Sequence, residues 1–435
     1  MIVMRLLSNQ FEEHDGKPVE GAGWVHGVRD VKKLFFAVVR DRAGKVQLIA
    51  KSPQALEQCR QLGLEDVIRF RGTARKNPGV KMGGVEIELD SLEVLSKAAS
   101  PLPVDIAGKT DTNFENRFDH RALDLRRDEP QAVFKLRHSL CNAFREFLSG
   151  QGFLEIHTPK IIATGTEGGT SLFPVKYFEK QAFLAQSPQF YKQMLVGAGF
   201  ERVFEIAPVF RAEEHNTPYH LNEYVSLDLE MGFIKNEEDV MKVTQDFLVH
   251  AAKQVNLRNK AELEQFNTAL EVPKTPFPTV NYWDLPDVFK EHGKTFSPKE
   301  DLTREHESII GKWAQEKHGS RFVFVNHYPS DHRPAYTMPF EENGDFTRGY
   351  DLLFDGVEIV TGGQRIHDPA LLAKRFRAKG FDPAKYEFYF EVFKYGMPPH
   401  GGQAIGLERL TTKILGIQNV REAAFFPRDR TRVTP

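Results

Sequence analysis

Two arginine-bearing segments, about two hundred residues apart, carry the strongest chemical signal in this chain. The first runs from Phe210 through Arg211 to Thr217, and the second is Gly406-Leu407-Glu408-Arg409-Leu410. A guanidinium is planar, permanently charged and able to donate two parallel hydrogen bonds, so it suits phosphate oxygens better than an ammonium does. Either arginine alone would more often form a surface ion pair. Each of the two could clamp a triphosphate, and acidic residues that could accompany a metal ion lie between them in the chain.

The acidic residues that could hold the metal are Asp351 and Glu358. They lie seven positions apart, with Gly356 at a turn between them, so a hairpin can bring both carboxylates to one Mg²⁺. Magnesium needs few protein ligands and completes its shell with phosphate and water. The alternative from spacing alone is that both are ordinary acids at strand ends.

Length and composition set the class of protein. The 435 residues predict two or three domains, and 40% hydrophobic with 27% charged residues is ordinary for a soluble protein. No apolar run approaches the roughly 20 residues of a membrane span, and the start of the chain is unlike a secretory signal, so the cytoplasm is expected and a membrane partner is not. Cys59 and Cys141 show no metal-binding or disulfide pattern. A net charge of −2 means that any nucleic acid must be bound by local patches.

Residues 1–103 predict a small β-barrel of OB type. Five strand-like runs surround one helix expected near 53–62, and another kind of small barrel is the alternative. The runs are 22–27, 34–41, 46–50, 67–72 and 85–89.

The rest of the chain predicts an α+β domain. A polar hinge is expected over 104–130, followed by a domain over 131–435 that carries a small insertion near 259–345. Apolar spacing predicts a long helix over 130–150, and later strand-like runs with helices between them indicate an antiparallel sheet flanked by helices. Those strands are expected at 182–185, 202–206, 225–231, 350–354 and 357–360, and the helices at 190–198, 237–254, 369–379, 390–395 and 406–415.

Long segments of the chain resemble a known family. Residues 186–193, 203–213 and 362–368, with the final 425–429, are similar to aspartyl-tRNA synthetases of the compact archaeal and eukaryotic type, in subclass IIb of the class II enzymes. The Arg211 and Arg409 segments resemble motifs 2 and 3 of that class. The resemblance implies a ligase that activates L-aspartate with ATP to aspartyl-adenylate and transfers it to the 3′ end of tRNA(Asp). Such chemistry rests on positioning and electrostatics, without a covalent enzyme intermediate.

The resemblance also implies which residues bind the nucleotide. Arg211 would hold the α-phosphate, Glu213 would accept from the adenine amino group, and Arg409 would cover the adenine and reach the γ-phosphate. His220 matches a position that touches the terminal phosphates. Tyr224 stands where the family usually stacks a phenylalanine on the base, and Glu358 would act with Asp351 through magnesium.

For aspartate, the resemblance implies two cations and a set of polar partners. Lys192 and Arg365 would bind the side-chain carboxylate, and Lys192 separates aspartyl from asparaginyl enzymes, because an amide would leave a buried ammonium poorly paired. A lone lysine on this helix would usually be solvated. The remaining aspartate-binding positions are Gln189, Asp228 and Thr166 around the ammonium group, Glu167 in a loop that closes over the substrate, and Thr361.

Anticodon recognition is implied in the barrel. Phe36 and Gln47 match positions that stack on and hydrogen-bond the central anticodon base, and Arg29 matches a backbone or base contact. Without the catalytic motifs, Phe36 would equally suit a barrel core. His26 and Pro78 resemble the relaxed type of enzyme that also charges tRNA(Asn), whose product a separate amidotransferase would consume.

Other positions concern the dimer and departures from the pattern. Pro159 resembles the motif 1 proline at a two-fold interface, which implies a homodimer, and an edge-strand proline is the alternative. Pro218-Tyr219 replaces a polar residue and an arginine that usually precede His220. Residues 401–404 form an altered approach to motif 3. Rival functions are an asparaginyl-tRNA synthetase and a non-catalytic RNA-binding paralogue, which would be expected to lose Arg211, Arg409 or the magnesium acids.

Overall fold

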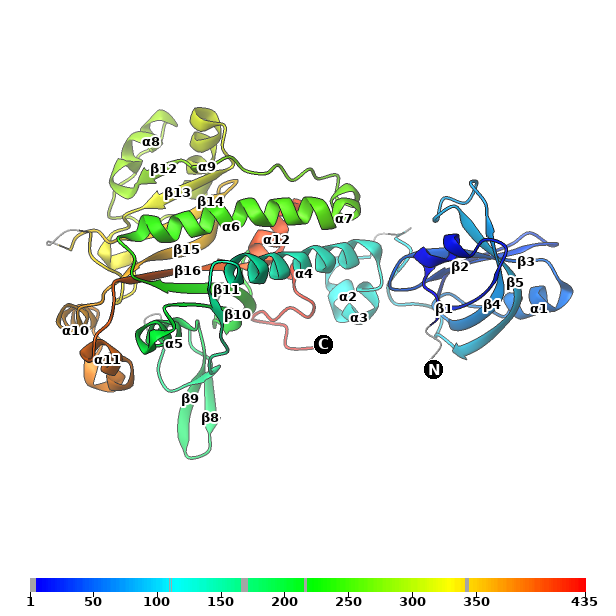
Figure 1. The fold of residues 1–435 in the computed structure, drawn as a ribbon, viewed down its shortest axis with the longest axis horizontal. Coiled ribbons are helices and arrows are strands. Elements are labelled where there is room, and N and C mark those ends of the chain that lie inside the picture. The colour runs from blue at the N-terminus through cyan, green and yellow to red at the C-terminus, as the bar shows by residue number, and fades with distance from the viewer. Residues whose placement is uncertain (1–4, 109, 111, 166–170, 215–216, 341–343) are drawn as a thin grey trace. The chain divides into compact units, whose positions relative to one another are not determined.

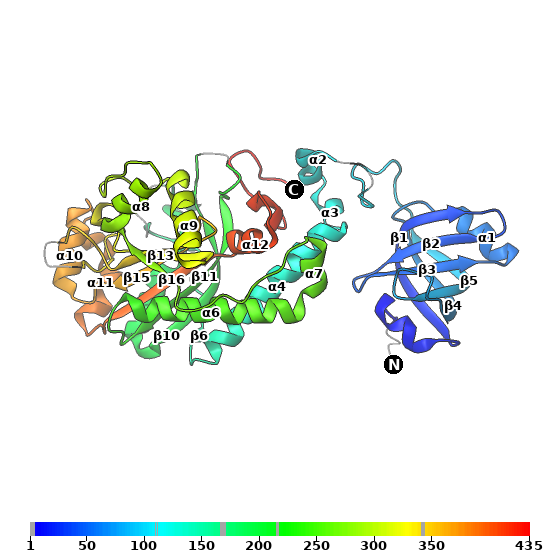
Figure 2. The same cartoon turned by 90° about the horizontal axis from the view of Figure 1, so that it is seen from above.

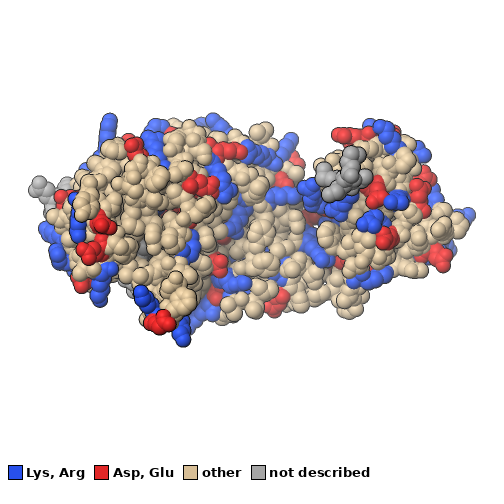
Figure 3. Space-filling model, turned by 60° about the horizontal axis from the view of Figure 1, so that its bottom comes forward, with Lys and Arg blue, Asp and Glu red and all other residues tan. Residues whose placement is uncertain are grey.

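The computed structural model describes residues 5–435 except 109, 111, 166–170, 215–216 and 341–343 (Figures 1 and 2). The chain divides into two compact units, Met1–Arg127 and Asp128–Pro435. Lysine and arginine side chains are interspersed with acidic ones on the face of each unit that Figure 3 shows. Among the described residues, no helix is long and apolar enough to cross a lipid bilayer.

The described part of the first unit forms a closed barrel with strand order β1-β2-β3-β5-β4, which confirms the OB-type prediction. Side chains alternate between interior and surface along each strand, and Val25, Ile68 and Ile87 are completely buried. Gly72 lies so close to the neighbouring strand that a Cβ would stand 2.2 Å from the carbonyl oxygen of Glu88. The elements are η1 (Ser8–His14), β1 (Pro18–Asp30), β2 (Phe35–Arg40), β3 (Lys45–Ala50), α1 (Pro53–Arg60), β4 (Val67–Lys76) and β5 (Val85–Ser96).

The polar segment after the barrel contains two short helices, α2 (Phe114–Asp119) and α3 (Arg121–Asp124), where the sequence suggested only a hinge. Three arginines converge on the buried carboxylate of Asp124: Arg117 Nε at 2.8 Å, Arg121 Nη1 at 2.5 Å and Arg127 Nη1 at 3.1 Å. Burial alone would raise the pKa of Asp124, but the arginines outweigh it and lower that pKa. The charged residues that make this segment resemble a linker therefore hold it in a folded conformation through ion pairs with Asp124.

The second unit is built on a sheet whose described strands have the order β12-β13-β14-β15-β16-β11-β10-β6. Neighbouring strands are antiparallel except β12 with β13 and β6 with β10, which confirms the α+β class. The glycine-rich strand β16, which lacks an apolar pattern, lies between β15 and β11. The strands are β6 (Leu154–Glu155), β10 (Arg202–Phe210), β11 (Glu223–Gly232), β12 (Thr279–Asn281), β13 (Phe322–Asn326), β14 (Gly349–Phe354), β15 (Val357–Arg365) and β16 (His400–Gly406). A smaller sheet contains β7 (Ile161–Ile162), β8 (Pro174–Tyr177) and β9 (Lys180–Leu184).

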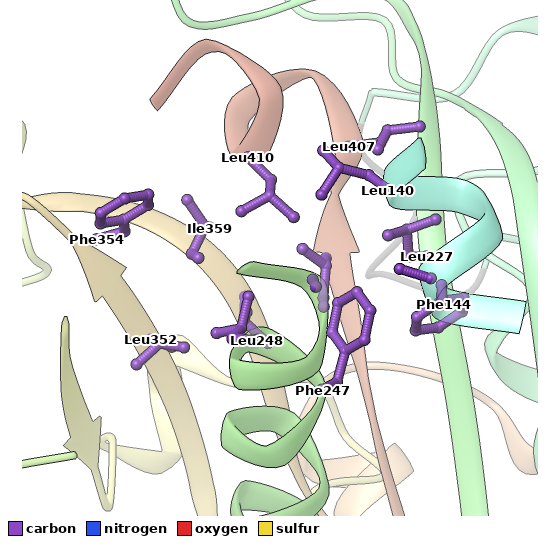
Figure 4. Close-up of a cluster of buried hydrophobic side chains, with 14 of the residues drawn as sticks. Leu140, Phe144, Leu227, Phe247, Leu248, Leu352, Phe354, Ile359, Leu407 and Leu410 are labelled. Atoms are coloured by element: carbon purple, nitrogen blue, oxygen red, sulfur yellow. The ribbon is translucent and has the colours of Figure 1, made fainter. Parts of the chain in front are cut away.

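Two long helices, α4 (Asp128–Ser149) and α6 (Glu237–Arg258), pack against each other, and α6 also packs on β15 and β16. Figure 4 shows Phe144 of α4, Phe247 of α6 and Leu407 of α12 (Leu407–Leu415) gathered in the core between the helices and the sheet. The remaining helices are α5 (Gln189–Leu195), η2 (Val196–Phe200), α7 (Lys260–Gln265), η3 (Tyr282–Asp284), α8 (Leu285–Glu291), α9 (Arg304–His318), η4 (Ser330–His332), α10 (Pro369–Ala378), η5 (Pro383–Tyr386), α11 (Glu387–Lys394) and η6 (Val420–Ala423).

The segment over 259–345 has its own apolar cluster, which includes Tyr282, Phe289 and Ile310 of η3, α8 and α9. Its strands β12 and β13 nevertheless continue the main sheet at one edge. The segment therefore extends the sheet and places α9 beside β13 and β15.

Replacing Phe144 with alanine should lower the free energy of unfolding of the second unit by about 3–5 kcal/mol, because it leaves a cavity in a close-packed core. The ring is fully buried and meets the edges of Phe204 and Phe247 at centroid distances of 5.6 and 5.0 Å. Urea unfolding in a Trp24→Phe background reports this unit through Trp283 and Trp313. Leu257→Ala, at a side chain that is 77% exposed on α6, is the matched control. A loss below about 1 kcal/mol for Phe144→Ala would contradict this packing.

Candidate active site

A cavity of about 700 Å³ opens in the second unit, on the sheet between α5, α12 and the strands β11, β15 and β16. Its lining brings together most of the residues expected to bind ATP and aspartate. They are Gln189, Lys192, Arg211, Glu213, His220, Tyr224, Asp228, Glu358, Thr361, Arg365 and Arg409. Asp351 does not appear in this lining, and Thr166 and Glu167 lie outside the described residues.

Strand β11 forms one wall of the cavity, because every second side chain along it faces the cavity. Tyr224, Ser226 and Asp228 stand two residues apart, so their side chains face the same side of the sheet and all line the cavity. Arg211 follows the end of the neighbouring strand β10, with its guanidinium carbon 5.8 Å from the centroid of the Tyr224 ring. Burial raises the pKa of Tyr224 although Arg211 opposes the shift, so this ring is neutral at physiological pH.

Arg409 projects from the first turn of α12 and bonds Glu358. Its Nη1 donates to the Glu358 carbonyl oxygen at 3.2 Å and to Oε2 at 3.3 Å. Burial alone would raise the pKa of Glu358, but Arg409 and the hydroxyl of Thr361, which donates to Oε1 at 2.8 Å, lower it. Strand β14 has a bulge between Leu352 and Leu353, which shifts its register with β15 in the region of Glu358 and Thr361.

Glu408, which the sequence reasoning passed over, anchors the helix that carries Arg409. This buried carboxylate accepts from the backbone N–H of Val225 at 3.1 Å and pairs with Arg137 of α4 at 2.7 Å. The helix is thereby tied to β11 and to α4 at its N-terminus, where the dipole favours negative charge. Arg409 is held over the cavity by its neighbour in sequence.

His220 lies at the same end of the cavity. Its Nδ1 is 2.6 Å from the hydroxyl oxygen of Thr217. Burial lowers the pKa of His220, and the positive charge of Arg409 lowers it further, so the ring is neutral at physiological pH. Glu213 follows Arg211 in the same loop, and its N–H donates to the Arg211 carbonyl oxygen at 2.8 Å.

Lys192 marks the other end of the cavity, where it is 2% exposed. Its Nζ lies 2.9 Å from Asp228 Oδ1 and 3.3 Å from Glu230 Oε2, and it donates to the carbonyl oxygens of Leu229 and Gln403 at 3.2 and 3.3 Å. Such burial is tolerated only because the ammonium is fully paired.

Arg365 shares Glu230 with Lys192. Its Nε lies 3.2 Å from Glu230 Oε1, and its Nη2 donates to the carbonyl oxygen of Gly402 at 2.9 Å. Burial would raise the pKa of Glu230, but Arg365 and then Lys192 outweigh it and lower that pKa. A Cβ at Gly402 would stand 2.1 Å from Glu230 Oε2, so this carboxylate needs glycine opposite it.

Glu230 and Gly402 were missed from the sequence, although one signal for Glu230 was present. It stands two residues after Asp228, and strand alternation places both carboxylates on one face. Gln189 Nε2 also lies 3.4 Å from Glu230 Oε2. The hydroxyl of Thr361 donates to Glu358, and its expected place among the aspartate-binding residues stays a prediction.

Asp351 and Glu358 come from the paired strands β14 and β15, joined through Gly356 at φ +66°. Asp351 is buried beside Arg333, whose Nη2 lies 2.8 Å from Oδ2, and no described residue bonds its Oδ1. Burial and the nearby charge of Glu358 raise the pKa of Asp351 to about 6, against the effect of Arg333. Arg333, which the sequence analysis did not single out, is therefore the positive charge that partly offsets the cost of burying the Asp351 carboxylate.

Residues expected at the anticodon lie mainly on one outer face of the barrel. Phe36 is half-buried on β2 and pairs across the strands with Arg29, and Val38 next along that face pairs with Gln47. Gln47 Nε2 donates to Glu86 Oε2 at 3.1 Å. His26 Nδ1 lies 3.4 Å from Arg40 Nη1. Pro78 is exposed in the loop between β4 and β5.

Pro159 is exposed after the edge strand β6. Leu154 and Ile161 on either side of it are 49% and 48% exposed. Leu154 belongs to the edge strand β6 of the large sheet and Ile161 to the edge strand β7 of the smaller one, and exposed apolar side chains on edge strands suit a partner surface.

Comparisons with known proteins agree with this fold. Residues 113–430 match the family described as tRNA synthetases class II (D, K and N), and residues 19–95 match the OB-fold nucleic acid binding domain. The chain belongs to this family of class II tRNA synthetases.

Among its relatives, the aspartate–tRNA(Asp/Asn) ligase of Methanopyrus kandleri is 47% identical over 97% of each chain. The aspartate–tRNA(Asp) ligase of Pyrococcus furiosus is 45% identical over 98% of each. Among solved structures, asparaginyl-tRNA synthetase from Pyrococcus horikoshii aligns over all of both chains with a TM-score of 0.93 and 30% identity. Aspartyl-tRNA synthetase from Entamoeba histolytica has a TM-score of 0.88 and 32% identity over 99% of this chain and 93% of that one.

Glu230→Gln should lower the free energy of unfolding at pH 7 by about 3 kcal/mol, because it leaves two buried cations with less compensation. The pKa of Glu230 in the folded protein lies below its usual value of 4.5, so its charge stabilises the fold above that pH. This contribution is lost as the pH falls through the folded pKa, and the difference between variant and wild type should therefore shrink in acid. Urea unfolding from pH 7 to pH 3 measures it, with the exposed Glu391→Gln as control. A difference that stays constant or grows in acid would refute the charge argument.

Proposed function

We propose that this chain is an aspartate–tRNA ligase, which joins L-aspartate and ATP to aspartyl-adenylate and transfers the aspartyl group to the 3′ end of tRNA(Asp). The observation that carries the proposal is the placement of Lys192 and Arg365 in the same cavity as Arg211 and Arg409. One pair of cations suits the side chain of an acidic amino acid, and the other pair suits a triphosphate.

Charge balance at the aspartate end favours a carboxylate substrate. Lys192 and Arg365 are matched by Asp228 and Glu230. Asp228 Oδ2 is buried and no described residue bonds it, so it is available to the ammonium group of an amino acid. As Asp228 turns to that ammonium, the substrate side chain takes its place beside Lys192. Gln189, Thr166, Glu167 and Thr361 complete the proposed aspartate-binding set.

At the nucleotide end, Arg211 would hold the α-phosphate and stabilise the charge that develops as the aspartate carboxylate attacks in line. Glu213 would accept from the adenine amino group, with the base between Tyr224 and Arg409. His220 and the Arg409 guanidinium would meet the terminal phosphates. No residue needs to form a covalent bond, because the donors for the developing charge are already in position.

Asp351 and Glu358 fit a magnesium ion by their chemistry. Glu358 lines the cavity, and Asp351 is buried on the paired strand β14, close enough for the charge of Glu358 to raise its pKa. No described residue bonds Asp351 Oδ1. Among the described residues, no group of three or more His, Cys, Asp and Glu side chains is placed to hold a metal, so phosphates and water would fill the remaining positions. Bound there, magnesium would neutralise phosphate charge.

The rival functions are less well supported. A likeness of fold to both aspartyl- and asparaginyl-tRNA synthetases does not separate the two amino acids, so the choice rests on Lys192. Asparagine would bring a neutral amide to this ammonium and leave it less well paired. A non-catalytic RNA-binding paralogue would have no reason to keep Arg211, Arg409 and both carboxylates.

The tRNA would be read by the barrel, with Phe36 stacking on the central anticodon base and Gln47 and Arg29 contacting its edge or backbone. His26 and Pro78 support the relaxed form of the enzyme, which also charges tRNA(Asn). Named relatives of both kinds share 43–47% of the sequence. Aspartyl-tRNA(Asn) must then be amidated before translation, which would make an amidotransferase the downstream partner.

The domain plan that goes with this function has an anticodon-binding domain over 1–103, a hinge over 104–130 and a catalytic domain over 131–435 with its insertion near 259–345. The proposed assembly is a two-fold homodimer through the edge around Pro159, and the proposed compartment is the cytoplasm.

Purified protein should catalyse exchange of pyrophosphate into ATP that depends on L-aspartate and not on L-asparagine. Arg211→Gln should lower the kcat of this exchange about 100- to 1000-fold, because it removes a donor to the developing charge. Lys374→Gln, at an exposed position on α10, is the control and should match the wild type. Exchange driven equally by asparagine would overturn the choice of substrate, and an unchanged kcat in Arg211→Gln would overturn the role of Arg211.

Charging of purified tRNA(Asp) and tRNA(Asn) transcripts tests the relaxed specificity. Both should receive aspartate, and His26→Trp should reduce charging of tRNA(Asn) more than that of tRNA(Asp), because a larger ring reshapes the anticodon surface. Absence of product with tRNA(Asn) in the wild type would defeat this part of the proposal.

A further inference from the structure

Arg304, the first residue of α9, lies beside the nucleotide end of the cavity but belongs to none of the expected motifs. Its guanidinium carbon is 4.4 Å from the centroid of the Tyr219 ring. Its Nη1 lies 2.6 Å from Glu307 Oε2, and its Nη2 is buried and bonded by no described residue.

The surroundings of Arg304 connect it to the residues proposed to bind phosphate. Glu307 Oε2 also accepts from the backbone N–H of Glu358 at 3.1 Å, and the Glu358 carboxylate is bonded by Arg409. Tyr219, His220 and Arg409 all line the cavity. After burial, the charges of Arg409 and Arg304 are among the causes that lower the pKa of His220. Arg304 does not itself line the cavity, but it contacts Tyr219, which does, and its charge reaches His220.

Helix stability does not account for an arginine at this position. A cation in the first turn of a helix is unfavourable with the helix dipole. The ion pair with Glu307 joins residues one helical turn apart, and it uses only one of the two terminal nitrogens of Arg304. The Tyr219 ring attracts the guanidinium that lies over it. A buried N–H group with no acceptor costs free energy, which a phosphate oxygen would recover.

The sequence of the motif 2 loop supplies an independent reason. Pro218-Tyr219 stands where the resembled family has a polar residue and an arginine before His220, so the loop offers one cation fewer. The ring of Tyr219 lies against the guanidinium of Arg304. Arg304 of α9 therefore supplies a cation next to this loop.

We propose that Arg304 binds the terminal phosphates of ATP and of the pyrophosphate leaving group, with Tyr219 as the platform that orients it. This inference rests on the proposed function, since it requires a triphosphate in the cavity. Arg304 and Arg409 would then hold the terminal phosphates from two sides, while Arg211 acts at the α-phosphate.

Arg304→Ala should raise the KM for ATP in aspartate-dependent pyrophosphate exchange about 10- to 100-fold, the effect of losing a charge-assisted hydrogen bond. The KM for aspartate should change less than about twofold, because Lys192 and Arg365 are untouched. Lys312→Ala removes an exposed cation from the same helix and is the matched control.

Binding measurements separate phosphate recognition from a disturbed fold. By calorimetry, Arg304→Ala should weaken ATP binding and leave AMP binding unchanged, since AMP lacks the terminal phosphates. Adding Tyr219→Arg to Arg304→Ala should recover most of the ATP affinity by returning a guanidinium to the loop.

Three outcomes would overturn the inference: an unchanged KM for ATP, an equal weakening of ATP and AMP, or normal exchange with a loss confined to tRNA charging, which would assign Arg304 to the acceptor stem. Failure of the proposed function is distinguishable, because the wild type would then show no aspartate-dependent exchange.

Discussion

Glu230 lies between Lys192 and Arg365 with all three side chains buried, and this part of the cavity depends on the shared carboxylate. Removing an ammonium or a guanidinium from water costs several kcal/mol unless its partners are well placed. One carboxylate faces both cations, and backbone oxygens of β11 and β16 accept hydrogen bonds from their other donors. Gly402 leaves room for the Glu230 carboxylate, so the glycine in strand β16 is needed for this arrangement of charges.

The same arrangement recurs around Arg409 and Arg333. Glu358 holds Arg409, Arg333 faces Asp351, and Glu408 fixes the helix on which Arg409 stands. Arg409 and Arg333 are therefore each held by a carboxylate before any ligand arrives. Because these cations are already oriented, they need not reorganise when the reaction begins, as solvated side chains would. Such preorganisation is the main way in which a site without a nucleophile can accelerate acyl transfer.

The sequence predicted correctly those elements whose residue pattern lies within a short stretch of the chain. The apolar spacing of α4 predicted its helix, and alternating strands predicted the barrel and most of the sheet. It failed where a side chain's partner is distant in the chain. Strand β16 has glycines where an apolar pattern was sought, and its place became clear only from its neighbours. Arg333 and Arg304 look like ordinary surface arginines until the fold sets them beside Asp351 and Tyr219.

The central claim is that one cavity holds the anions of both substrates. Calorimetric titration with a non-hydrolysable sulfamoyl analogue of aspartyl-adenylate tests it most directly, because this single molecule spans both ends. The account predicts one equivalent bound per chain, with displacement by ATP and, separately, by L-aspartate. An analogue that does not bind, or that only one of the two substrates displaces, would contradict it.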